Sequence, residues 1–413
     1  MKILYLNTTY QCGGAEQVVS QLKRGMERRG HEVHQIVSYD TRNLKLPPNV
    51  HVLYNSFGMR VFNRLITGNH GNQSLHIPYS ARYIRSYIKK HQIDVLHFHN
   101  LHDNFLGIRD IPELAAACPT IWTLHDFWAL TGHCASPYGC EEEKWKKGCA
   151  SCPCLGNYPA LRKDAAHRLF LEKKKAFRKY PLTFTVPSGW LLRQFKASHL
   201  KGLPCERVYN SLDTDLWRPL ERQKVREAYQ IGAEEKVIGF IAADPEKKLK
   251  GMPYLLEALH RLSNPEDYLL LVAGKESREL QELKGKYRVR HLGYLSEQKA
   301  LREFYTLADV LVNPSVYDTF GLTNIEAMAC GTPVIAFPVC AMPEILEEGC
   351  GWIAGEVGSE ALAEAIARAF SDRELLEKKG RASRRRAEQV FSEEKMLDRF
   401  EEIYQETVKG GSL

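Results

Sequence analysis

Short apolar runs alternate with amphipathic stretches along this sequence from its first residues. Lys2–Asn7 (KILYLN) is a continuous, mostly apolar run of the kind that forms a strand buried on both faces. The stretch from Ala15 then places Val18 and Met26 on one helical stripe, and Gly30 marks the end of this helix. A second strand-like run (HEVHQIVS) follows at once. Because βαβ units build parallel sheets covered by helices, this pattern predicts an α/β fold with an open, mostly parallel sheet.

The alternating pattern occurs twice, which indicates two domains. Further strands are expected in the first half at IDVLHFHN, TIWTLHD and LTFTVPS, and in the second half at EKVIGFIAA, DYLLLVAG, DVLVNPS and PVIAF. A length of 413 residues also exceeds one typical core. We expect residues 1–207 and a returning helix at about 390–413 to form one Rossmann-like domain, and residues 208–389 to form the other. The stretch Asn210–Pro219 suits a linker.

The composition is that of a folded globular protein. Apolar residues make up 44% of the chain and charged residues 26%, and no low-complexity tract occurs. No run approaches the ~20 apolar residues that a membrane span needs. The N-terminal run turns polar too soon for a secretory signal, so we expect a cytoplasmic protein.

The net charge of +7 is distributed unevenly along the chain. Lys and Arg are concentrated, with aromatic residues between them, in Arg82–Lys90 and Leu161–Tyr180. A basic face of this kind suits an anionic membrane surface, phosphorylated lipids or nucleic acid, but it is equally consistent with a solvated surface that has no partner. The sequence leaves these alternatives open, including a peripheral position at the inner face of the membrane.

Gly13 and Gly14 lie between the first predicted strand and the first predicted helix. Glycines at this position allow the backbone to approach a phosphate or a sugar, with helix N–H groups directed at the ligand. A tight turn without a ligand is the alternative, since the pair lacks the G-x-G-x-x-G spacing of dinucleotide binders. Open α/β sheets bind ligands at the carboxyl ends of their strands, and with two domains we expect the ligand cleft between them.

A cluster of lysines follows the first strand of the second half. Lys247, Lys248 and Lys250 lie in a loop that opens a helix (DPEKKLKGMPYLLEAL). A helix N-terminus with ammonium groups beside it favours negative charge. The loop is therefore predicted to bind an anion, and a solvated lysine cluster is the alternative.

Two acids flank a Phe-Gly turn in the stretch SVYDTFGLTNIEAMACG. Seven residues separate Asp318 from Glu326, and Phe320, Gly321 and Leu322 between them are placed to begin a helix with free backbone N–H groups. Glu326 falls about one turn inside that helix among apolar residues, where a carboxylate without a partner would be costly. A carboxylate that accepts two hydroxyl hydrogen bonds is the usual means of holding a ribose, so Glu326 is a candidate for that contact.

A cysteine-rich insertion is expected at about residues 127–160. Cys134, Cys140, Cys149 and Cys152 are spaced C-x5-C-x8-C-x2-C. In a cytosolic protein such clustering favours a metal over disulfides, and a tetrahedral structural zinc held by these four thiolates is predicted. Disulfides and free thiols are the alternatives, and a catalytic zinc is not expected.

Together these motifs resemble those of the retaining GT-B glycosyltransferases of the family 4 type, in the branch that assembles bacterial polysaccharides and glycolipids. The sequence has GGAE at Gly13–Glu16, DVLHFH at Asp94–His99, TLHD at Thr123–Asp126, the pair Lys250–Gly251 and the long stretch Ser315–Phe337, in the order found in that family. The resemblance covers essentially the whole chain. It implies two Rossmann-like domains that face each other across a cleft, and transfer of a sugar from a nucleotide-diphosphate sugar to a saccharide or lipid-linked acceptor with no cofactor required.

The resemblance also implies roles for individual residues. His125 would orient the transferred sugar, Lys250 would neutralise the departing diphosphate, and Asp318 stands where the family has a Glu near the sugar hydroxyls. Glu326 would bind the nucleotide ribose. The other positions implied on the donor side are Gly13, Gly14, Lys248, Leu295, Phe320, Gly321 and Leu322. The positions implied on the acceptor side are His99 and Asn100.

The sequence departs from the family pattern in three places. One is the linker, which reads YNSLD at residues 209–213 where PNGVD is common. The loop GFIAADPEKKLKG has no Arg before Lys250, where the family usually has one, and a Lys lacks the bidentate fork of Arg. Asp318 is one methylene shorter than the usual Glu. The resemblance still implies transfer with retention at the anomeric carbon, in which Lys250 and helix N–H groups stabilise the departing phosphates without a metal.

Two other classes of protein share part of the pattern. A nucleotide-sugar epimerase is another enzyme of the GT-B fold, but EAMACGTPV and the Lys-Gly loop argue against it. A nucleic-acid-binding protein with a zinc knuckle would use the basic face. That class leaves Asp318 and Glu326 without a role, so no nucleic-acid partner is expected.

Overall fold

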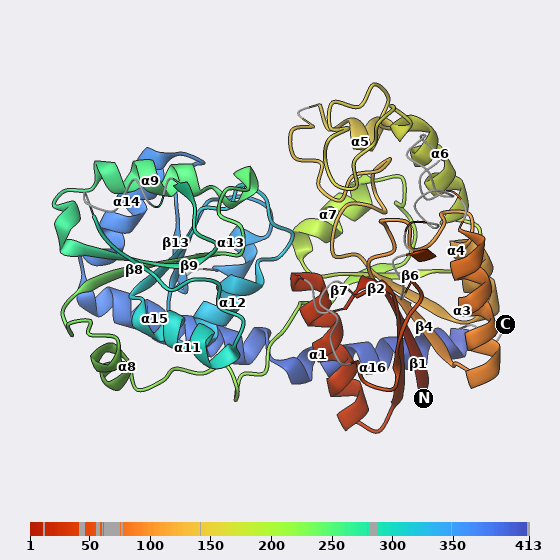
Figure 1. Ribbon diagram of the computed structural model, residues 1–413, viewed down its shortest axis with the longest axis horizontal. Coiled ribbons are helices and arrows are strands. Elements are labelled where there is room, and N and C mark those ends of the chain that lie inside the picture. Colours follow the sequence, from red (N-terminus) through yellow and green to blue (C-terminus); the bar gives the residue numbers. More distant parts are fainter. Residues whose placement is uncertain are drawn as a thin grey trace. The chain divides into compact units, whose positions relative to one another are not determined.

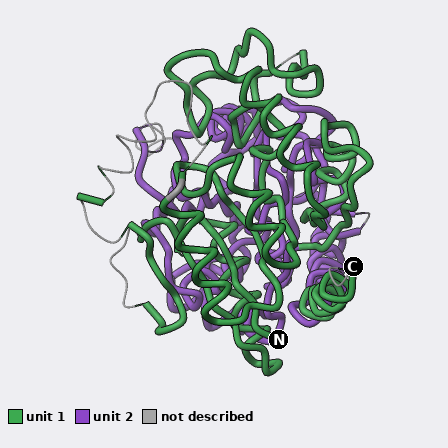
Figure 2. The backbone as a smooth tube through the Cα atoms, turned by 90° about the vertical axis from the view of Figure 1, so that its right-hand side faces the viewer, with its two compact units in different colours: residues 1–209, 396–413 green, residues 210–395 purple. Residues whose placement is uncertain are grey.

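The computed structural model describes residues 1–10, 13–40, 46–54, 58–59, 61, 75, 77–140, 142–278, 280, 287–347 and 349–410. The chain divides into two compact units (Figure 2). Unit 1 consists of residues 1–209 and 396–413, and unit 2 consists of residues 210–395. The chain therefore passes from one unit to the other twice.

The described part of unit 1 is built on a sheet of seven parallel strands, in the order β3-β2-β1-β4-β5-β6-β7. Its strands are β1 (Lys2–Thr9), β2 (Glu32–Tyr39), β3 (Val50–Val52), β4 (Val95–Phe98), β5 (Thr120–Thr123), β6 (Thr183–Val186) and β7 (Cys205–Arg207). The central strands β1 and β4 are mostly or fully buried, as expected for strands covered on both faces. The edge strands β3 and β7 have three residues each (VHV and CER), and the sequence pattern does not predict them.

Helices cover this sheet, and the last of them comes from the far end of the chain (Figure 1). They are α1 (Gly14–Arg28), α3 (Pro78–His91), α4 (Ile111–Ala117), α5 (Lys144–Lys147), α6 (Ala166–Ala176), α7 (Gly189–Ala197) and α16 (Glu393–Gly410). On α16, the Tyr404 hydroxyl lies 3.0 Å from the Tyr5 hydroxyl of β1. Gly25 of α1 permits this packing, because a Cβ there would lie 2.5 Å from Leu397 Cδ2. No helix in the described part of the chain is long and apolar enough to cross a membrane.

Unit 2 forms a second parallel sheet, with six strands among its described residues in the order β10-β9-β8-β11-β12-β13. Its strands are β8 (Lys236–Ala242), β9 (Tyr268–Gly274), β10 (Arg288–His291), β11 (Val310–Asn313), β12 (Val334–Ala336) and β13 (Gly351–Ile353). Its helices are α8 (Arg222–Ala228), α9 (Met252–Arg261), α11 (Gln298–Leu307), α12 (Leu322–Ala329), α13 (Met342–Ile345), α14 (Ser359–Phe370) and α15 (Arg373–Val390). Helices α9 and α14 contact each other over one face, and α12 contacts α11 and α15 over the other (Figure 1).

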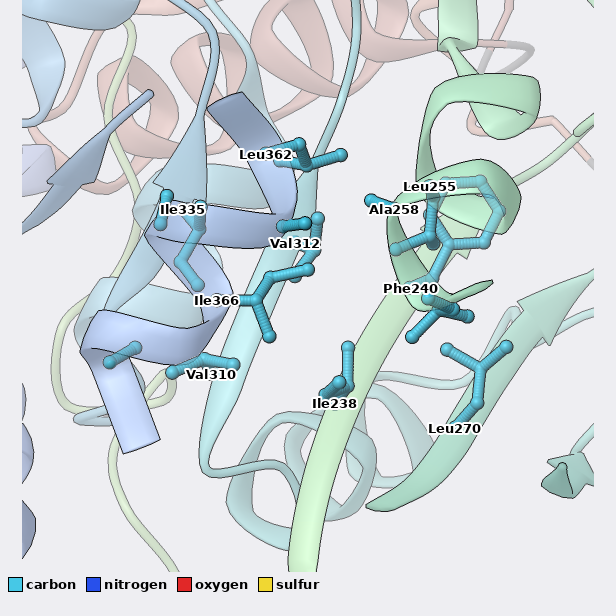
Figure 3. Close-up of a cluster of buried hydrophobic side chains, with 14 of the residues drawn as sticks. Ile238, Phe240, Leu255, Ala258, Leu270, Val310, Val312, Ile335, Leu362 and Ile366 are labelled. Atoms are coloured by element: carbon cyan, nitrogen blue, oxygen red, sulfur yellow. The ribbon is translucent and has the colours of Figure 1, made fainter. Parts of the chain in front are cut away.

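A hydrophobic core of unit 2 lies between the sheet and the layer formed by α9 and α14 (Figure 3). Ile238 of β8 and Val310 of β11 pack in one cluster with Leu255 of α9 and Ile366 of α14, and all four side chains are completely buried. Burial of one such side chain stabilises the fold by about 1.5–3 kcal/mol. The core therefore holds β8 and β11 side by side, and the prediction of an α/β fold with two parallel sheets is confirmed.

Candidate active site

Each sheet has a switch point, which is the position between two neighbouring strands at which the chain order reverses. In unit 1 it lies between β1 and β4, and in unit 2 it lies between β8 and β11. Because paired strands are parallel, the loops that follow them lie at one edge of their sheet. Open α/β sheets bind ligands at this position. In unit 2 these loops carry Lys250 and Asp318, and in unit 1 they carry Gly13 and His99.

The two loops at the switch point of unit 2 are in direct contact. Lys250 Nζ lies 3.6 Å from Asp318 Oδ2, and both side chains are partly exposed. Gly251 has a φ of +68°, and a Cβ at this position would lie 1.8 Å from the carbonyl oxygen of Pro314. Glycine is the residue that permits both this backbone conformation and this close approach. The Lys-Gly pair therefore fixes the lysine loop against the loop that carries Asp318.

The N-terminus of α12 lies at the same edge of the sheet. Gly321 precedes the helix with a φ of +86°, and no described side chain caps it. Asp318 Oδ1 accepts a hydrogen bond from the backbone N–H of Phe320 at 3.2 Å, which orders the turn. The first N–H groups of a helix, here from Leu322 onward, have no acceptor inside the helix. Together with Lys250 they favour an anion at this position.

Glu326 lies in the second turn of α12. Its Oε2 accepts a hydrogen bond from the Tyr305 hydroxyl at 2.7 Å, while Oε1 has no hydrogen bond to a described residue. Burial raises the pKa of Glu326 to about 7, and the hydrogen bond from Tyr305 opposes this shift. The free oxygen is available to a ligand hydroxyl, and it is the better acceptor above pH 7, where the carboxylate is ionised.

Two further positions implied on the donor side, Lys248 and Leu295, also lie at this edge. Lys248 begins the short 3-10 helix Lys248–Lys250, and its exposed side chain has no ion pair with a described residue. Leu295 follows β10, where the carbonyl of Gly293 accepts a hydrogen bond from the N–H of Gly274 at 2.9 Å. This bond places Leu295 beside the carboxyl end of β9.

Side chains join the two loops at the switch point of unit 1. Asn7 Oδ1 accepts a hydrogen bond from the backbone N–H of Asn100 at 3.0 Å, and the Thr8 hydroxyl donates to the Asn100 carbonyl at 2.9 Å. Gly13 and Gly14 are exposed at the N-terminus of α1, and Gly13 is in an extended conformation. The glycine pair and Asn100 therefore follow neighbouring strands at one edge of the sheet.

Two of the histidines implied by the resemblance are in contact. His99 Nδ1 lies 3.0 Å from His125 Nε2, and both rings are buried. Burial lowers the pKa of His99 well below its usual range and that of His125 to about 4. Both rings are therefore neutral near pH 7, and His125 is better suited to orienting a ligand than to removing a proton. His97 lies beside them and binds Tyr404 and Thr123, so it is structural.

The sequence pattern does not predict the contact between Asp126 and His102. Asp126 Oδ2 lies 3.0 Å from His102 Nε2, and Oδ1 accepts a hydrogen bond from the backbone N–H of Trp128 at 2.7 Å. Burial raises the pKa of Asp126, but the charge and hydrogen bond of His102 outweigh it and leave the pKa lowered. The only sign of this residue in the sequence is that it follows His125 directly.

Asp126 and His102 belong to an acidic pocket of 330 Å³ in unit 1. Its wall includes Thr9, Glu16, Tyr39, His102, Asp126 and Tyr158. The Thr9 hydroxyl donates to Glu16 Oε1 at 3.0 Å. Carboxylates, hydroxyls and aromatic rings around one pocket are complementary to a molecule that carries many hydroxyl groups.

The structure does not support the predicted zinc site. Cys134, Cys140, Cys149 and Cys152 are free thiols, and the described part of the chain has no group of three or more His, Cys, Asp or Glu side chains that could hold a metal ion. The sulfur atoms have protein partners instead. Cys149 Sγ accepts from the N–H of Gly132 at 3.2 Å, and Cys152 Sγ lies 3.6 Å from a ring nitrogen of His133.

A buried lysine connects the cysteine-rich insertion to α6. Lys173 Nζ donates to the carbonyls of Trp128 and Thr131, and it lies 3.9 Å from the centre of the Trp128 ring. Burial lowers the pKa of Lys173 to about 7, while Cys134 and Cys149 oppose this shift. Lys173 therefore fixes the loop that follows Asp126 by hydrogen bonds to its backbone.

Two family models match the chain, and together they span most of its length. The model for Glycosyltransferase Family 4 matches residues 12–216, and the model for Glycosyl transferases group 1 matches residues 221–386. The chain belongs to the group 1 glycosyltransferases of the GT-B type. The prediction of a transferase is confirmed. Both models describe glycosyltransferases, and neither describes an epimerase or a nucleic-acid-binding protein.

Similar proteins cover the full length of this glycosyltransferase. It is 26% identical to the putative colanic acid biosynthesis glycosyl transferase WcaC of Escherichia coli, over 98% of this chain and 100% of that protein. It is 23% identical to N-acetyl-α-D-glucosaminyl L-malate synthase of Bacillus anthracis, over 99% and 98%. Among solved structures, sucrose-phosphate synthase from Thermosynechococcus elongatus has a TM-score of 0.76 at 19% identity and 99% coverage of both chains. Anabaena HepE in complex with UDP-glucose has a TM-score of 0.68 at 17% identity, covering 98% of this chain and 100% of that chain.

Proposed function

We propose that this glycosyltransferase moves a sugar from a nucleotide-diphosphate sugar to a saccharide or lipid-linked acceptor, with retention at the anomeric carbon. The observation that carries the proposal is the contact between Lys250 and Asp318 beside the uncapped start of α12. An ammonium group next to helix N–H groups is complementary to a diphosphate. The likeness to Anabaena HepE in complex with UDP-glucose supports a donor of this class.

The donor-binding residues of the proposal all come from unit 2. Glu326 Oε1 accepts a hydroxyl of the ribose, because Tyr305 occupies only Oε2. The backbone near Leu295 contacts the base. The N–H groups of Gly321 and Leu322 bind the diphosphate, while that of Phe320 stays with Asp318. The exposed ammonium group of Lys248 supplies part of the charge of the missing Arg.

The chemical step proposed for these residues is a front-face displacement. The acceptor oxygen bonds to the anomeric carbon from the side on which the bond to the diphosphate breaks, so the configuration is retained. The bonding electrons leave with the diphosphate, which also receives the acceptor proton. Lys250 and the α12 N–H groups stabilise the growing negative charge, an effect worth several kcal/mol in preorganised sites. Asp318, held by Phe320, accepts a hydroxyl of the transferred sugar.

The residues proposed to meet the transferred sugar from unit 1 are neutral. His125 hydrogen-bonds and orients a sugar hydroxyl, which agrees with the low pKa that burial gives it. The backbone at Gly13 and Gly14 approaches the donor diphosphate and its sugar without a side chain in the way.

The acceptor is proposed to bind in unit 1, with His99 and Asn100 beside the acidic pocket. Glu16 and Asp126 accept hydrogen bonds from hydroxyl groups, and the rings of Tyr39 and Tyr158 supply apolar surface. A saccharide matches this pocket better than a phosphate does, because the carboxylates repel anions. The similarity to a protein named for colanic acid biosynthesis supports a role in polysaccharide or glycolipid synthesis.

In this proposal each of the two units binds one substrate. Residues 210–395 form the donor domain and residues 1–209 with 396–413 form the acceptor domain, close to the boundaries of 207/208 and 389/390 expected from the sequence. No metal takes part in the proposed step.

If the acceptor is lipid-linked, we propose that the protein binds to the cytoplasmic face of a membrane. Two helices of unit 1 expose basic and apolar side chains together. On α3 these are Tyr79, Arg82, Lys89 and Lys90, and on α6 they are Arg168, Leu171, Lys174 and Lys175. Such faces bind anionic lipids more tightly than neutral ones. Sedimentation with vesicles that contain phosphatidylglycerol should recover the protein at low salt, and equal recovery with neutral vesicles would contradict the proposal.

The donor is testable with UDP-, GDP- and ADP-sugars. A ligand that binds the folded protein raises its melting temperature, so one of these donors should produce a shift that Glu326→Ala reduces. Transfer to a saccharide acceptor should then give a product whose anomeric configuration, read from its proton NMR coupling, matches the donor. Binding of none of the donors, or an inverted product, would contradict the proposed function.

A further inference from the structure

Unit 2 has a cavity at the edge of its sheet opposite the donor loops. Its volume of 540 Å³ lies in the range of small-molecule sites. Asp309 and Pro333, which immediately precede β11 and β12, lie in its wall. Asp318 follows β11. The cavity and the donor site therefore lie at opposite ends of β11, and they have no residue in common.

The wall of this cavity is strongly basic. Its five arginines are Arg222, Arg373, Arg381, Arg384 and Arg385. Its two carboxylates, Asp309 and Glu377, leave a net charge of +3 among the wall residues at neutral pH. Outside the wall, Glu388 pairs with Arg384 at 2.7 Å and Glu234 lies 3.6 Å from Arg373. Positions 373, 377, 381 and 385 recur every fourth residue of α15, so one face of this helix presents its charges to the cavity.

Asp309 is already neutralised by other groups. Its Oδ1 accepts from Arg222 at 2.6 Å, and its Oδ2 accepts from Arg226 at 2.9 Å and from the backbone N–H of Val237 at 2.7 Å. Burial lowers the pKa of Arg222, and the charges of Arg226 and Arg373 add to this effect. Both oxygens of Asp309 therefore already bind groups outside α15.

Glu377 offers only weak pairing to the arginines of α15. It lies 3.4 Å from Arg373 Nε and 3.7 Å from Arg381 Nη1, and all three side chains are more than half exposed. Arg385 has no ion pair with a described residue. Exposed pairs of this kind contribute little, about 0–1 kcal/mol. The guanidinium groups of Arg381 and Arg385 are thus available to an anion.

Part of the cavity wall is apolar and closely packed, and Thr306 and Thr332 contribute hydroxyl groups elsewhere in the lining. A Cβ on Gly380 of α15 would lie 2.6 Å from the carbonyl oxygen of Gly331, so the helix rests directly on the loop after α12. Pro219, Leu220 and Leu376 complete the lining beside the arginines. A ligand that fits this cavity has an anionic group and an uncharged part of the size of a sugar ring.

We propose that this cavity binds a small phosphorylated molecule, such as a sugar phosphate. Its phosphate is held by Arg373, Arg381 and Arg385, and its uncharged part lies against Pro219 and Leu376. Arginine suits this task because its planar fork binds two phosphate oxygens at once. The proposal is independent of the donor assignment, since it uses other residues at the other end of the strands.

Isothermal titration of the full chain with glucose 6-phosphate, glucose and inorganic phosphate tests this proposal. Glucose 6-phosphate should bind, inorganic phosphate should bind more weakly, and glucose should not bind. Replacing two exposed arginines in Arg381→Ala/Arg385→Ala should weaken the affinity for glucose 6-phosphate at least 10-fold. The matched control Arg368→Ala/Lys378→Ala removes two exposed cations of the same unit that lie outside the cavity wall. It should change the affinity less than twofold.

One further variant and one further probe separate this site from others. Lys250→Ala alters the proposed donor site and should leave the affinity for glucose 6-phosphate unchanged. Loss of binding in Lys250→Ala with retention in Arg381→Ala/Arg385→Ala would place the phosphate at the donor site and overturn the proposal. Absence of binding in the wild type would also overturn it. The proposal would also be overturned if the wild type bound anionic vesicles but not glucose 6-phosphate, and the double variant lost this vesicle binding. That result would identify a lipid surface as the ligand. Melting temperatures within 2 °C of the wild type, on the order expected for surface changes, show that each variant is folded.

Discussion

In unit 2 the loops at the switch point carry lysines beside a helix N-terminus, whereas the corresponding loops of unit 1 carry buried histidines beside an acidic pocket. Lys250 is partly exposed and lies 3.6 Å from Asp318. His99 and His125 are buried, and burial keeps their pKa low enough for both rings to be neutral. The parallel sheets are similar in both units, so the strand topology does not determine this difference.

In the proposed function, one kind of sheet serves two ligands. A diphosphate that gains charge as it leaves needs fixed cations, and the loops after β8 and β11 supply them. A hydroxyl-rich acceptor needs hydrogen-bond acceptors without positive charge, and the wall around Asp126 supplies these. The chemistry therefore belongs to the loops, while the sheets bring them together.

The largest effect is expected from loss of the cation in unit 2. Lys250→Ala should lower kcat about 10²–10³-fold, because it removes a charge that stabilises the leaving diphosphate in the transition state. Initial rates with the donor found by the screen measure this. The matched variant Lys248→Ala removes an exposed lysine that has no ion pair with a described residue, and it should cost less than 10-fold. Equal losses in both variants would mean that the loop acts only through its overall charge.

Glu326→Gln should weaken nucleotide binding about 10- to 100-fold at pH 8, which corresponds to a hydrogen bond to a charged acceptor of about 1.5–3 kcal/mol. Because the pKa of Glu326 is about 7, the affinity for the nucleotide should also depend on pH. Protonation below pH 7 converts the acceptor oxygen to a neutral acid, so the affinity of the wild type should fall as the pH decreases from 8 to 6. Titration of Glu326→Gln should show no such change. A pH dependence that survives in Glu326→Gln would move the ribose contact to another residue.

Asp126→Asn tests the acceptor role proposed for the acidic pocket of unit 1. Replacing the carboxylate with an amide keeps its size but removes the charge that pairs with His102. The KM for the acceptor should rise about 5- to 10-fold, on the order of the 1–1.5 kcal/mol net value of one hydrogen bond, while the KM for the donor stays constant. Steady-state kinetics with each substrate varied in turn separate the two. A change confined to the donor KM would assign Asp126 to the donor and break the contrast between the units.

Much of the fold follows from the sequence because strands and helices have different periods. Lys2–Asn7 and the helix after Gly13 are continuous, regular patterns, and the structure has β1 and α1 there. Strands β3 and β7 escape prediction because three-residue edge strands are too short to show a period. The contact between Lys250 and Asp318 follows less directly, from the rule that loops at a switch point share one edge.

Sequence spacing does not determine how side chains are directed within a loop. The pairing of Asp126 with His102 depends on the conformation of two separate loops, and the TLHD motif that contains Asp126 does not indicate its partner. For the same reason, the spacing of Cys134 and its neighbours predicts a zinc site that the geometry does not support. The fourfold recurrence of charge on α15 is visible in the sequence, but the cavity beside it depends on Gly380 and Gly331 being in contact.

The smallest effect concerns the stability of unit 1 and the buried Lys173. Its pKa is about 7 in the folded protein, against an ordinary value of 10.5 for a solvated lysine, so between these values the unfolded chain binds more protons. The contribution of Lys173 to the free energy of unfolding should therefore rise with pH above 7, by at most about 2 kcal/mol between pH 7 and 8.5. Burial raises the pKa of Cys134 and Cys149 to about 12 and 11, whereas a solvated thiol titrates near pH 8.5, so these thiols act in the opposite direction and the contribution of Lys173 has to be isolated with a variant.

Lys173→Met removes this titration. The melting temperature of the wild type should increase relative to Lys173→Met as the pH goes from 7 to 8.5, whereas Lys174→Met, an exposed neighbour on α6, should follow the wild type. A constant difference between the wild type and Lys173→Met would mean that Lys173 stays charged in the fold. Unit 1 would then contain a buried ammonium group stabilised by the carbonyls of Trp128 and Thr131, in place of the neutral interior that distinguishes it from the lysine loop of unit 2.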